Sequence, residues 1–289
     1  MKAVRYRLEA LVAAGLYRLF EYLPRPVASA LGGAAGRCVG RLLPPVSKTA
    51  DRNLRRVWPG MDRRTRRRII VGVWDNIGRV AAELPHVHRC RVTSDGTAEG
   101  DIVVTGVEII EQIRASEQPV VFVSGHLGNW EVFAHVAAHY GLPVARVYRQ
   151  ANNPLVEAQI QKSRSHVPGG CIPKGAKGAR EILRLLKEGR SVGLLIDQRM
   201  SDGETVPFFG LPARTATAPV DLALRFGVPV VAVRCVRLPG SRFAITIMPP
   251  LRVTAETRDQ VLVTLNQQLE DWIRAHPEQW LWVHNRWKG

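Results

Sequence analysis

A histidine and a glutamate separated by four residues offer the clearest chemistry in this chain. His126 and Glu131 lie in the string SGHLGNWE at residues 124–131. A carboxylate beside an imidazole fixes its tautomer and raises its basicity, as a general base for a hydroxyl group requires. A histidine and a glutamate that merely flank a turn would have the same spacing. The spacing alone therefore leaves both interpretations open.

The elements around this string place the pair at the end of a strand. Residues 120–123 are apolar and rich in β-branched side chains, which predicts a buried strand. Asn129 is a candidate N-cap for a helix over 130–138. A five-residue step along a helix would rotate the two side chains about 140° apart. His126 must therefore lie in the turn, and Glu131 in the first helical turn, for the two to meet. Ligands of open α/β sheets bind outside the carboxyl ends of the strands, where this turn lies.

The composition limits the class of protein. A chain of 289 residues can form one large α/β domain or two small ones, and its net charge of +16 predicts an anionic partner. Nucleic acid, an acidic membrane surface and an acidic small substrate all fit that charge. The sequence has no helix-turn-helix, zinc-finger or aromatic-basic strand pattern, which argues against nucleic acid. Its four cysteines lack CxxC spacing, so we expect free thiols, no metal site and no disulfide framework.

Strands alternate with helices along most of the chain, and this pattern is typical of an α/β domain. We expect a single domain over 46–289 with a mostly parallel, mixed central sheet flanked by helices, preceded by a helical basic extension over 1–45. Residues 205–212 are interpreted as an apolar loop. The expected strands lie at 101–104, 120–123, 143–148, 192–196, 228–236 and 243–248, and the expected helices at 69–84, 106–113, 130–138, 155–165, 175–188 and 258–275.

The amino-terminal extension carries two short apolar segments, 8–17 and 27–43, edged by arginines. Neither forms an uninterrupted apolar run of about 20 residues, so we expect no conventional membrane-spanning helix. The segments fit helices lying in a membrane interface, and they also fit amphipathic helices packed on the domain. After a Pro-Pro break at 44–45, an arginine cluster spans 52–68. Such a cluster is either a solvated helical face or a contact with an anionic bilayer.

Five strings in this order resemble the bacterial lipid A biosynthesis (late) acyltransferases, the lauroyl and myristoyl transferases of the glycerolipid acyltransferase superfamily. The resemblance covers residues 120–288 and is looser over 8–43. The matching strings are SGHLGNWE at 124–131, VYRQANNPLV at 147–156, VGLLIDQR at 192–199, VPFFGLPARTATAP at 206–219 and HPEQWLWVHNRWK at 276–288.

This resemblance implies an enzyme that moves a fatty acyl chain from acyl carrier protein to a hydroxyl group of a lipid A precursor. It implies work at the cytoplasmic face of the inner membrane, with an acyl thioester of carrier protein or coenzyme A as donor and with no cofactor or metal. His126 and Glu131 would be the catalytic dyad of the family's His-x4-Glu motif. Arg164 and Asp197 would match the family's downstream arginine and aspartate, and Arg149 competes for the arginine's role.

The residues are compatible with that chemistry. The chain has no GxxxxGK[ST] phosphate loop and no GxSxG nucleophile elbow, and an activated thioester requires neither. Glu131 would hold the imidazole of His126, and a guanidinium such as Arg164 is expected to pair with Asp197. Backbone N–H groups near Gly128 and Asn129 are candidate oxyanion donors, which makes Asn129 a further substrate-binding candidate.

Two related activities use the same residues. An acyltransferase of the same superfamily that acts on a phosphatidylinositol mannoside, a lysophospholipid or an ornithine lipid would have the same dyad. A thioesterase-like hydrolase would differ only in admitting water to the thioester. Phe208 and Phe209 fit the lining of an acyl tunnel or an ordinary core.

Overall fold

The apolar run at 120–123 forms the centre of the fold. In the computed structural model it forms β3 (Val121–Ser124). Val121 and Val123 belong to one hydrophobic core, and Val120 and Phe122 to another, because successive side chains of a strand point to opposite faces. Strands buried on both faces are typical of parallel sheets covered by helices on each side. The structure describes residues 2–94 and 100–287, so Met1 and Lys288, which belong to the expected extension and the last matched string, lie outside it.

An eight-stranded sheet has the order β1-β2-β10-β9-β3-β6-β4-β5. Among the described strand pairs, β9 and β10 are antiparallel and the other neighbours in this sheet are parallel. The expected mostly parallel, mixed sheet is therefore confirmed. The other strands are β1 (Val92–Thr93), β2 (Ile102–Thr105), β4 (Ala145–Tyr148), β5 (Cys171–Pro173), β6 (Val192–Leu195), β9 (Val230–Leu238) and β10 (Arg242–Ile247).

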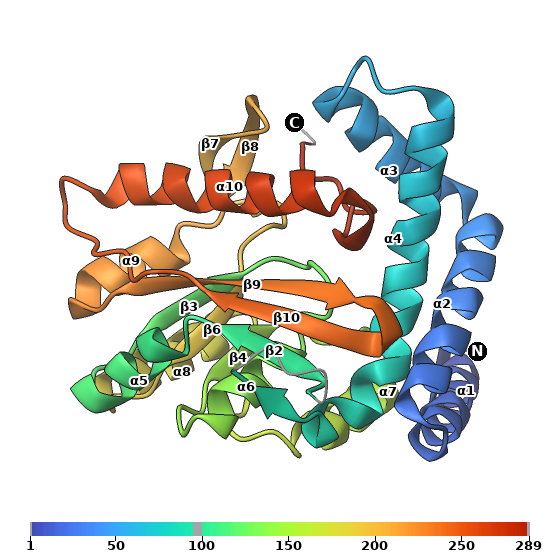
Figure 1. Ribbon diagram of the computed structural model, residues 1–289, viewed down its shortest axis with the longest axis horizontal. Coiled ribbons are helices and arrows are strands. Elements are labelled where there is room, and N and C mark those ends of the chain that lie inside the picture. Colours follow the sequence, from blue (N-terminus) through green and yellow to red (C-terminus); the bar gives the residue numbers. More distant parts are fainter. Residues whose placement is uncertain (1, 95–99, 288–289) are drawn as a thin grey trace.

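Helices cover both faces of the sheet (Figure 1). Side chains of α5 (Val107–Ser116) and α6 (Val132–His139) fill one core. Side chains of α8 (Ala176–Lys187), α9 (Ala218–Phe226) and α10 (Arg258–Ala275) fill the other. The final helix has the predicted bounds. The domain is therefore a three-layer α/β structure.

Four amino-terminal helices form an upright layer beside the sheet, at the end toward which β9 points (Figure 1). α2 and α4 pack so closely that a Cβ atom on Gly78 would lie 2.0 Å from the carbonyl oxygen of Gly32. This layer therefore stands next to the carboxyl ends of the central strands, where the sequence predicts the site. Its helices are α1 (Lys2–Tyr22), α2 (Arg25–Leu42), α3 (Pro44–Val57) and α4 (Arg63–Glu83).

Of two expectations at proline-containing segments, one is confirmed and one is wrong. The Pro-Pro pair at 44–45 follows the break between α2 and α3, as expected, and it begins α3, since proline is tolerated in the first turn of a helix. The apolar loop expected at 205–212 is an antiparallel hairpin of β7 (Glu204–Phe208) and β8 (Leu211–Thr215), in which Pro207 lies opposite Pro212. A two-stranded ribbon has only edges, so its prolines remove no hydrogen bond that a further strand would need.

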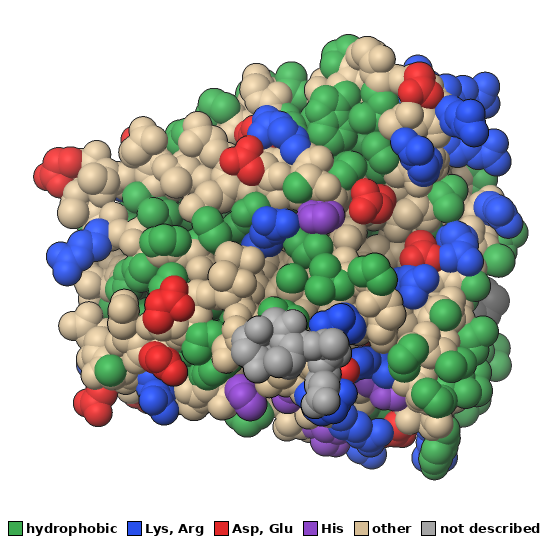
Figure 2. Space-filling view, viewed as in Figure 1, with side chains coloured by type: hydrophobic (Ala, Val, Ile, Leu, Met, Phe, Trp, Pro, Cys, Tyr) green, Lys and Arg blue, Asp and Glu red, His purple; other side chains and the backbone are tan. Residues whose placement is uncertain are grey.

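The amino-terminal helices leave an apolar stripe uncovered. The side chains that face α7 (Pro154–Arg164) include Tyr17, whose hydroxyl lies 3.1 Å from the Ser163 hydroxyl. The opposite side of α1 exposes Leu8, Leu11 and Val12 by about 60% or more. Figure 2 shows hydrophobic side chains over α1 and α2 at the lower right, and Lys and Arg side chains over the corner between α3 and α4 at the upper right. None of the described helices combines the length and apolar character needed to cross a bilayer.

Candidate active site

Two neighbouring parallel strands bring His126 and Asp197 together. Ser124 at the end of β3 pairs with Leu195 at the end of β6. Two residues beyond each of these positions lie His126 and Asp197. The imidazole Nδ1 of His126 is 2.8 Å from Oδ1 of Asp197, and the backbone N–H of His126 donates to Oδ2 at 2.8 Å. One carboxylate therefore holds both the ring and the backbone of the histidine.

Asp197 is fully buried and is held in its ionised form. The indole Nε1–H of Trp280 also donates to its Oδ2 at 2.8 Å, so three donors converge on this carboxylate. Burial raises the pKa of the carboxyl group, but the nearby charge of His126 and its hydrogen bonds outweigh that effect and lower the pKa below its ordinary value. An ionised carboxylate only accepts hydrogen bonds. The proton in this contact therefore lies on Nδ1 of His126.

That tautomer leaves Nε2 of His126 as the basic nitrogen. The side chain is 17% exposed and lines a cavity of about 360 Å³. A volume of this size is typical of a small-molecule site. Apart from its missing serine, the arrangement matches a Ser-His-Asp triad, in which a buried aspartate orients the imidazole and stabilises the imidazolium. The geometry provides a general base at the wall of a pocket.

Glu131 has a different partner from the one expected. Its carboxylate receives two hydrogen bonds from Arg164, from Nη2 at 2.5 Å and from Nε at 3.1 Å. No hydrogen bond among the described residues joins Glu131 to His126, so the expectation that Glu131 holds the imidazole is wrong. The expected pair of Arg164 with Asp197 is wrong for the same reason. A fork-shaped guanidinium matches the carboxylate of Glu131, whereas Asp197 accepts its hydrogen bonds from His126 and Trp280.

The pocket is polar at one end and apolar at the other. His126, Glu131, Arg149 and Arg164 line it together, so four of the six expected site residues share one cavity. Arg149 is exposed and forms no ion pair within the described part of the chain. The apolar end is formed by Phe122, Phe133, Ala134, Val144 and Leu194. Phe122 and Leu194 lie on β3 and β6, upstream of His126 and Asp197, so this end of the pocket lies back along the strands.

A larger cavity of about 750 Å³ lies between α4 and the segment that follows α10. None of the six expected site residues lines it. Its lining includes Asn76 and Gln279, which bind the backbone of Gly128, and Arg237, whose backbone N–H donates to Gln279. The smaller cavity is therefore the candidate active site, because it contains the oriented histidine.

Asn129 holds the turn and does not line the pocket. Its Oδ1 accepts a hydrogen bond from the backbone N–H of Glu131 at 3.1 Å, which is an N-cap type of contact, although the helix begins at Val132. The backbone N–H of Gly128 donates to the Gln279 carbonyl at 3.2 Å, so it is not a free oxyanion donor. Gly128 has φ +57°, and a Cβ atom there would lie 2.7 Å from the Cys235 carbonyl oxygen, so this position requires glycine.

The carboxyl-terminal segment builds the back of the site. Besides Trp280, it provides the backbone N–H of Leu281, which donates to the His126 carbonyl at 3.2 Å. Sequence reasoning assigned no role to Trp280, although it lies in one of the matched strings. Phe208 is fully buried and stacks on Trp287 with ring centroids 5.6 Å apart, and neither Phe208 nor Phe209 lines the pocket. These two phenylalanines are core residues.

Comparison with known proteins shows the family to which the chain is similar. Residues 1–289 match the family model described as bacterial lipid A biosynthesis acyltransferase. The chain is 25% identical over 287 residues to the lipid A biosynthesis lauroyltransferase of Escherichia coli (strain K12), covering 95% of this chain and 89% of the relative. It is 25% identical over 280 residues to the palmitoleoyltransferase of that strain, with the same coverage. Against the strain's lipid A biosynthesis myristoyltransferase, 25% identity extends over 187 residues, which cover 62% of this chain and 56% of the relative.

Replacing Asp197 tests the electrostatic origin of this arrangement. Because its pKa is lowered on folding, the carboxylate stabilises the folded chain above the ordinary value of 3.8, and this contribution is lost as the pH falls below that value. We expect Asp197→Asn to lower the free energy of unfolding at pH 7 by about 3 kcal/mol.

Urea unfolding of both proteins between pH 7 and pH 3 measures the effect. The difference between wild type and Asp197→Asn should be constant down to about pH 5 and should narrow below about pH 4. A difference that stays the same over the whole range would mean that Asp197 is not held ionised by its partners.

Proposed function

The chain belongs to the bacterial lipid A biosynthesis acyltransferases, which transfer acyl groups in lipid A biosynthesis, and from this premise we propose its reaction in more detail. It transfers a fatty acyl chain from the thioester of acyl carrier protein to a hydroxyl group of a lipid A precursor at the cytoplasmic face of the inner membrane. The observation that carries the proposal is the oriented imidazole of His126 at the polar end of an apolar pocket.

His126 acts as the general base in this proposal. Nε2 removes the proton of the acceptor hydroxyl while the hydroxyl oxygen attacks the thioester carbonyl carbon. The tetrahedral intermediate then expels the thiolate, which takes up the proton from the imidazolium and leaves as a thiol. A new ester bond forms and the thioester bond breaks, so no metal, cofactor or nucleotide enters the balance. Asp197 stabilises the imidazolium between these two steps.

Glu131 and Arg164 line the same pocket as His126. The side chain of Glu131 is 9% exposed and that of Arg164 is 15% exposed, so the pair is largely removed from water. The carboxylate keeps the guanidinium of Arg164 in one orientation and uses two of its five N–H groups, so the others are available to a substrate oxygen. In this role Glu131 contributes to catalysis through Arg164, in place of the direct contact with His126 that the motif suggested.

The acyl chain and the acceptor occupy different ends of the pocket. The apolar end around Phe122, Phe133 and Val144 suits a fatty acyl chain. Arg149 and Lys174 line the polar end, where exposed cations suit the phosphate groups of an acceptor. A lysophospholipid or another anionic lipid has the same charged group, and such lipids are the alternative acceptors.

The amino-terminal helices place this pocket next to the membrane in our proposal. α1 packs on α7, the helix that ends at Arg164 and begins just after the loop that holds Arg149. Its outer apolar stripe enters the interface, and the arginine cluster of α3 and α4 contacts anionic headgroups. An acceptor lipid then reaches the polar end of the pocket without crossing water.

Paired assays separate chemistry from acceptor binding. His126→Ala should lower both acyl transfer and hydrolysis of the donor without acceptor, by about 10² to 10⁴-fold, because it removes the base. Arg149→Ala should raise KM for a phosphorylated acceptor by about tenfold and leave donor hydrolysis unchanged, because the base and its carboxylate are intact.

The product is identified by mass spectrometry as acceptor plus one acyl chain, with a lipid A precursor and a lysophospholipid supplied in parallel. Near wild-type turnover of His126→Ala would contradict the assignment of the base. Faster acylation of the lysophospholipid would move the proposal to the alternative acceptor.

Point variants on α1 test the membrane contact better than truncation, because α2 is packed into the domain through α4. Burial of one leucine contributes about 1.5–3 kcal/mol. We therefore expect Leu8→Glu combined with Leu11→Glu to weaken binding to anionic vesicles by at least tenfold in a flotation assay. Leu224→Glu, at a leucine that is 38% exposed on α9, is the matched control and should bind as wild type does.

Vesicle composition and salt test the electrostatic part. Binding should be weaker to neutral vesicles and should fall at high salt, since screening reduces the attraction of exposed arginines. The assignment of α1 as the membrane-binding surface would be refuted if the α1 variant and Leu224→Glu lost vesicle binding equally. It would also be refuted if neither variant lost binding.

A further inference from the structure

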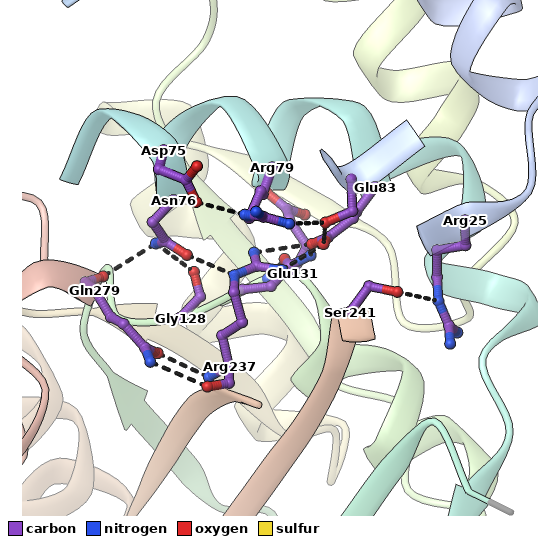
Figure 3. A network of polar contacts seen from close by, with 12 residues as sticks. Arg25, Asp75, Asn76, Arg79, Glu83, Gly128, Glu131, Arg237, Ser241 and Gln279 are labelled. Atoms are coloured by element: carbon purple, nitrogen blue, oxygen red, sulfur yellow. Dashed lines mark hydrogen bonds and ion pairs between the residues drawn. The ribbon is translucent and has the colours of Figure 1, made fainter. Parts of the chain in front are cut away.

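A network of buried polar side chains joins α4 to the HLGN turn, residues 126–129 (Figure 3). Asn76 and Glu83 are seven residues apart on α4, so two helical turns separate them and they lie on the same face. Arg237 on β9 reaches both. We call these three residues the α4 clamp. None of them lines the pocket that contains His126.

Glu83 holds the side chain of Asn129. Glu83 is 1% exposed, and its Oε2 accepts a hydrogen bond from Asn129 Nδ2 at 2.8 Å. Arg237 donates to both carboxylate oxygens, with Nη2 at 2.9 Å from Oε2. The Ser29 hydroxyl donates to Oε1 at 2.6 Å. A carboxylate on Nδ2 determines which way the amide of Asn129 points, so its Oδ1 faces the backbone N–H of Glu131.

Asn76 holds the backbone of the same turn. Its Nδ2 donates to the Gly128 carbonyl at 2.8 Å and to the Gln279 carbonyl at 3.1 Å. Its Oδ1 accepts from Arg237 Nε at 2.8 Å, which fixes the amide in this orientation. The Gln279 carbonyl also accepts from the Gly128 N–H, so Asn76 joins the turn to the segment that carries Trp280.

The two contacts restrain the turn between the two site residues. Gly128 and Asn129 lie between His126 and Glu131, and each is bound to one end of the clamp. A shift of the turn would move the imidazole relative to Asp197, which follows β6. It would also move Glu131 relative to Arg164, which stays on α7. Misplacement of reacting groups by about 1 Å is enough to lower a rate about 10²-fold.

We propose that Asn76 and Glu83, bridged by Arg237, are positioning residues that hold the HLGN turn in its reactive geometry. The inference rests on the proposed acyl transfer and adds to it residues that touch no substrate. The alternative explanation is that Glu83 and Arg237 form a buried ion pair that only stabilises the fold. The two explanations differ in the effect that they predict for an isosteric substitution on kcat.

Glu83→Gln and Asn76→Asp keep the size of each side chain and change its charge and its hydrogen-bonding pattern. A glutamine in place of Glu83 cannot accept from Arg237, Ser29 and Asn129 at once as a carboxylate does. An aspartate in place of Asn76 can still pair with Arg237, but it puts an oxygen against the two carbonyl groups that Asn76 now binds. Both variants should lower kcat by about tenfold to a hundredfold, for transfer and for donor hydrolysis alike. KM should stay within about twofold, since no substrate contact is lost.

Two control variants separate positioning from stability. Asp101→Asn weakens another largely buried pair, Arg25–Asp101, with side chains 15% and 18% exposed, which makes no hydrogen bond to the HLGN turn among the described residues. Ser29→Ala removes one hydrogen bond to Glu83 and leaves the contact with Asn129. Both should lower the melting temperature and keep wild-type kcat when assayed well below it.

The outcomes are distinct. Wild-type kcat in Glu83→Gln and Asn76→Asp would overturn the inference. The inference would also be overturned if Asp101→Asn lost as much kcat as the two clamp variants do at the same drop in melting temperature. Failure of both clamp variants to fold would overturn it too. Either result would mean that the network only stabilises the fold. The proposed function fails if the wild-type protein neither transfers the acyl group nor hydrolyses the donor. That result concerns the wild-type protein alone and does not depend on differences among the variants.

Discussion

One buried carboxylate organises the site of this protein. Asp197 is inaccessible to water, yet it is ionised, because three N–H donors from two other segments converge on it. Leaving any of these donors without an acceptor in the interior would be costly. The strand end of β6, the HLGN turn after β3 and the carboxyl-terminal segment must therefore meet at one point. The orientation of the imidazole follows from this constraint.

Two further buried carboxylates are paired with arginines around the same turn. Glu131 binds Arg164 in the pocket, and Glu83 binds Arg237 behind it. In a low-dielectric interior each charge requires a partner with good geometry, and a guanidinium provides two parallel hydrogen bonds. The pairing leaves Arg149 as an exposed cation at the pocket, without an ion pair in the part of the chain that the structure describes. The paired charges of Glu131, Arg164, Glu83 and Arg237 therefore stabilise the site, whereas the charge of Arg149 is available to a substrate.

Local patterns in the sequence were sufficient for most of the elements, and four of the six expected site residues line one pocket. The apolar run at 120–123 and the final helix at 258–275 depend on neighbours in the chain, and the structure confirms them. The helix expected to follow a cap at Asn129 instead begins at Val132, with Glu131 at its N-cap. The choice of ionic partner depends on distances between strands and helices far apart in sequence. The expected pairs of Glu131 with His126 and Arg164 with Asp197 were therefore wrong. Glu83 and Arg237 are 154 residues apart and carry no local signal at all.

Asp197 keeps the proton of the neutral imidazole on Nδ1 of His126 and leaves Nε2 free to act as the base in the proposed reaction. Nitrogen-15 NMR of the protein labelled at histidine measures this directly, with His126→Ala to assign the signal. The account predicts that, once the ring is neutral, Nδ1 of His126 gives the chemical shift of a protonated nitrogen and Nε2 that of an unprotonated one, and that this difference is reduced in Asp197→Asn. A proton on Nε2, or an equal mixture of tautomers in the wild-type protein, would contradict it.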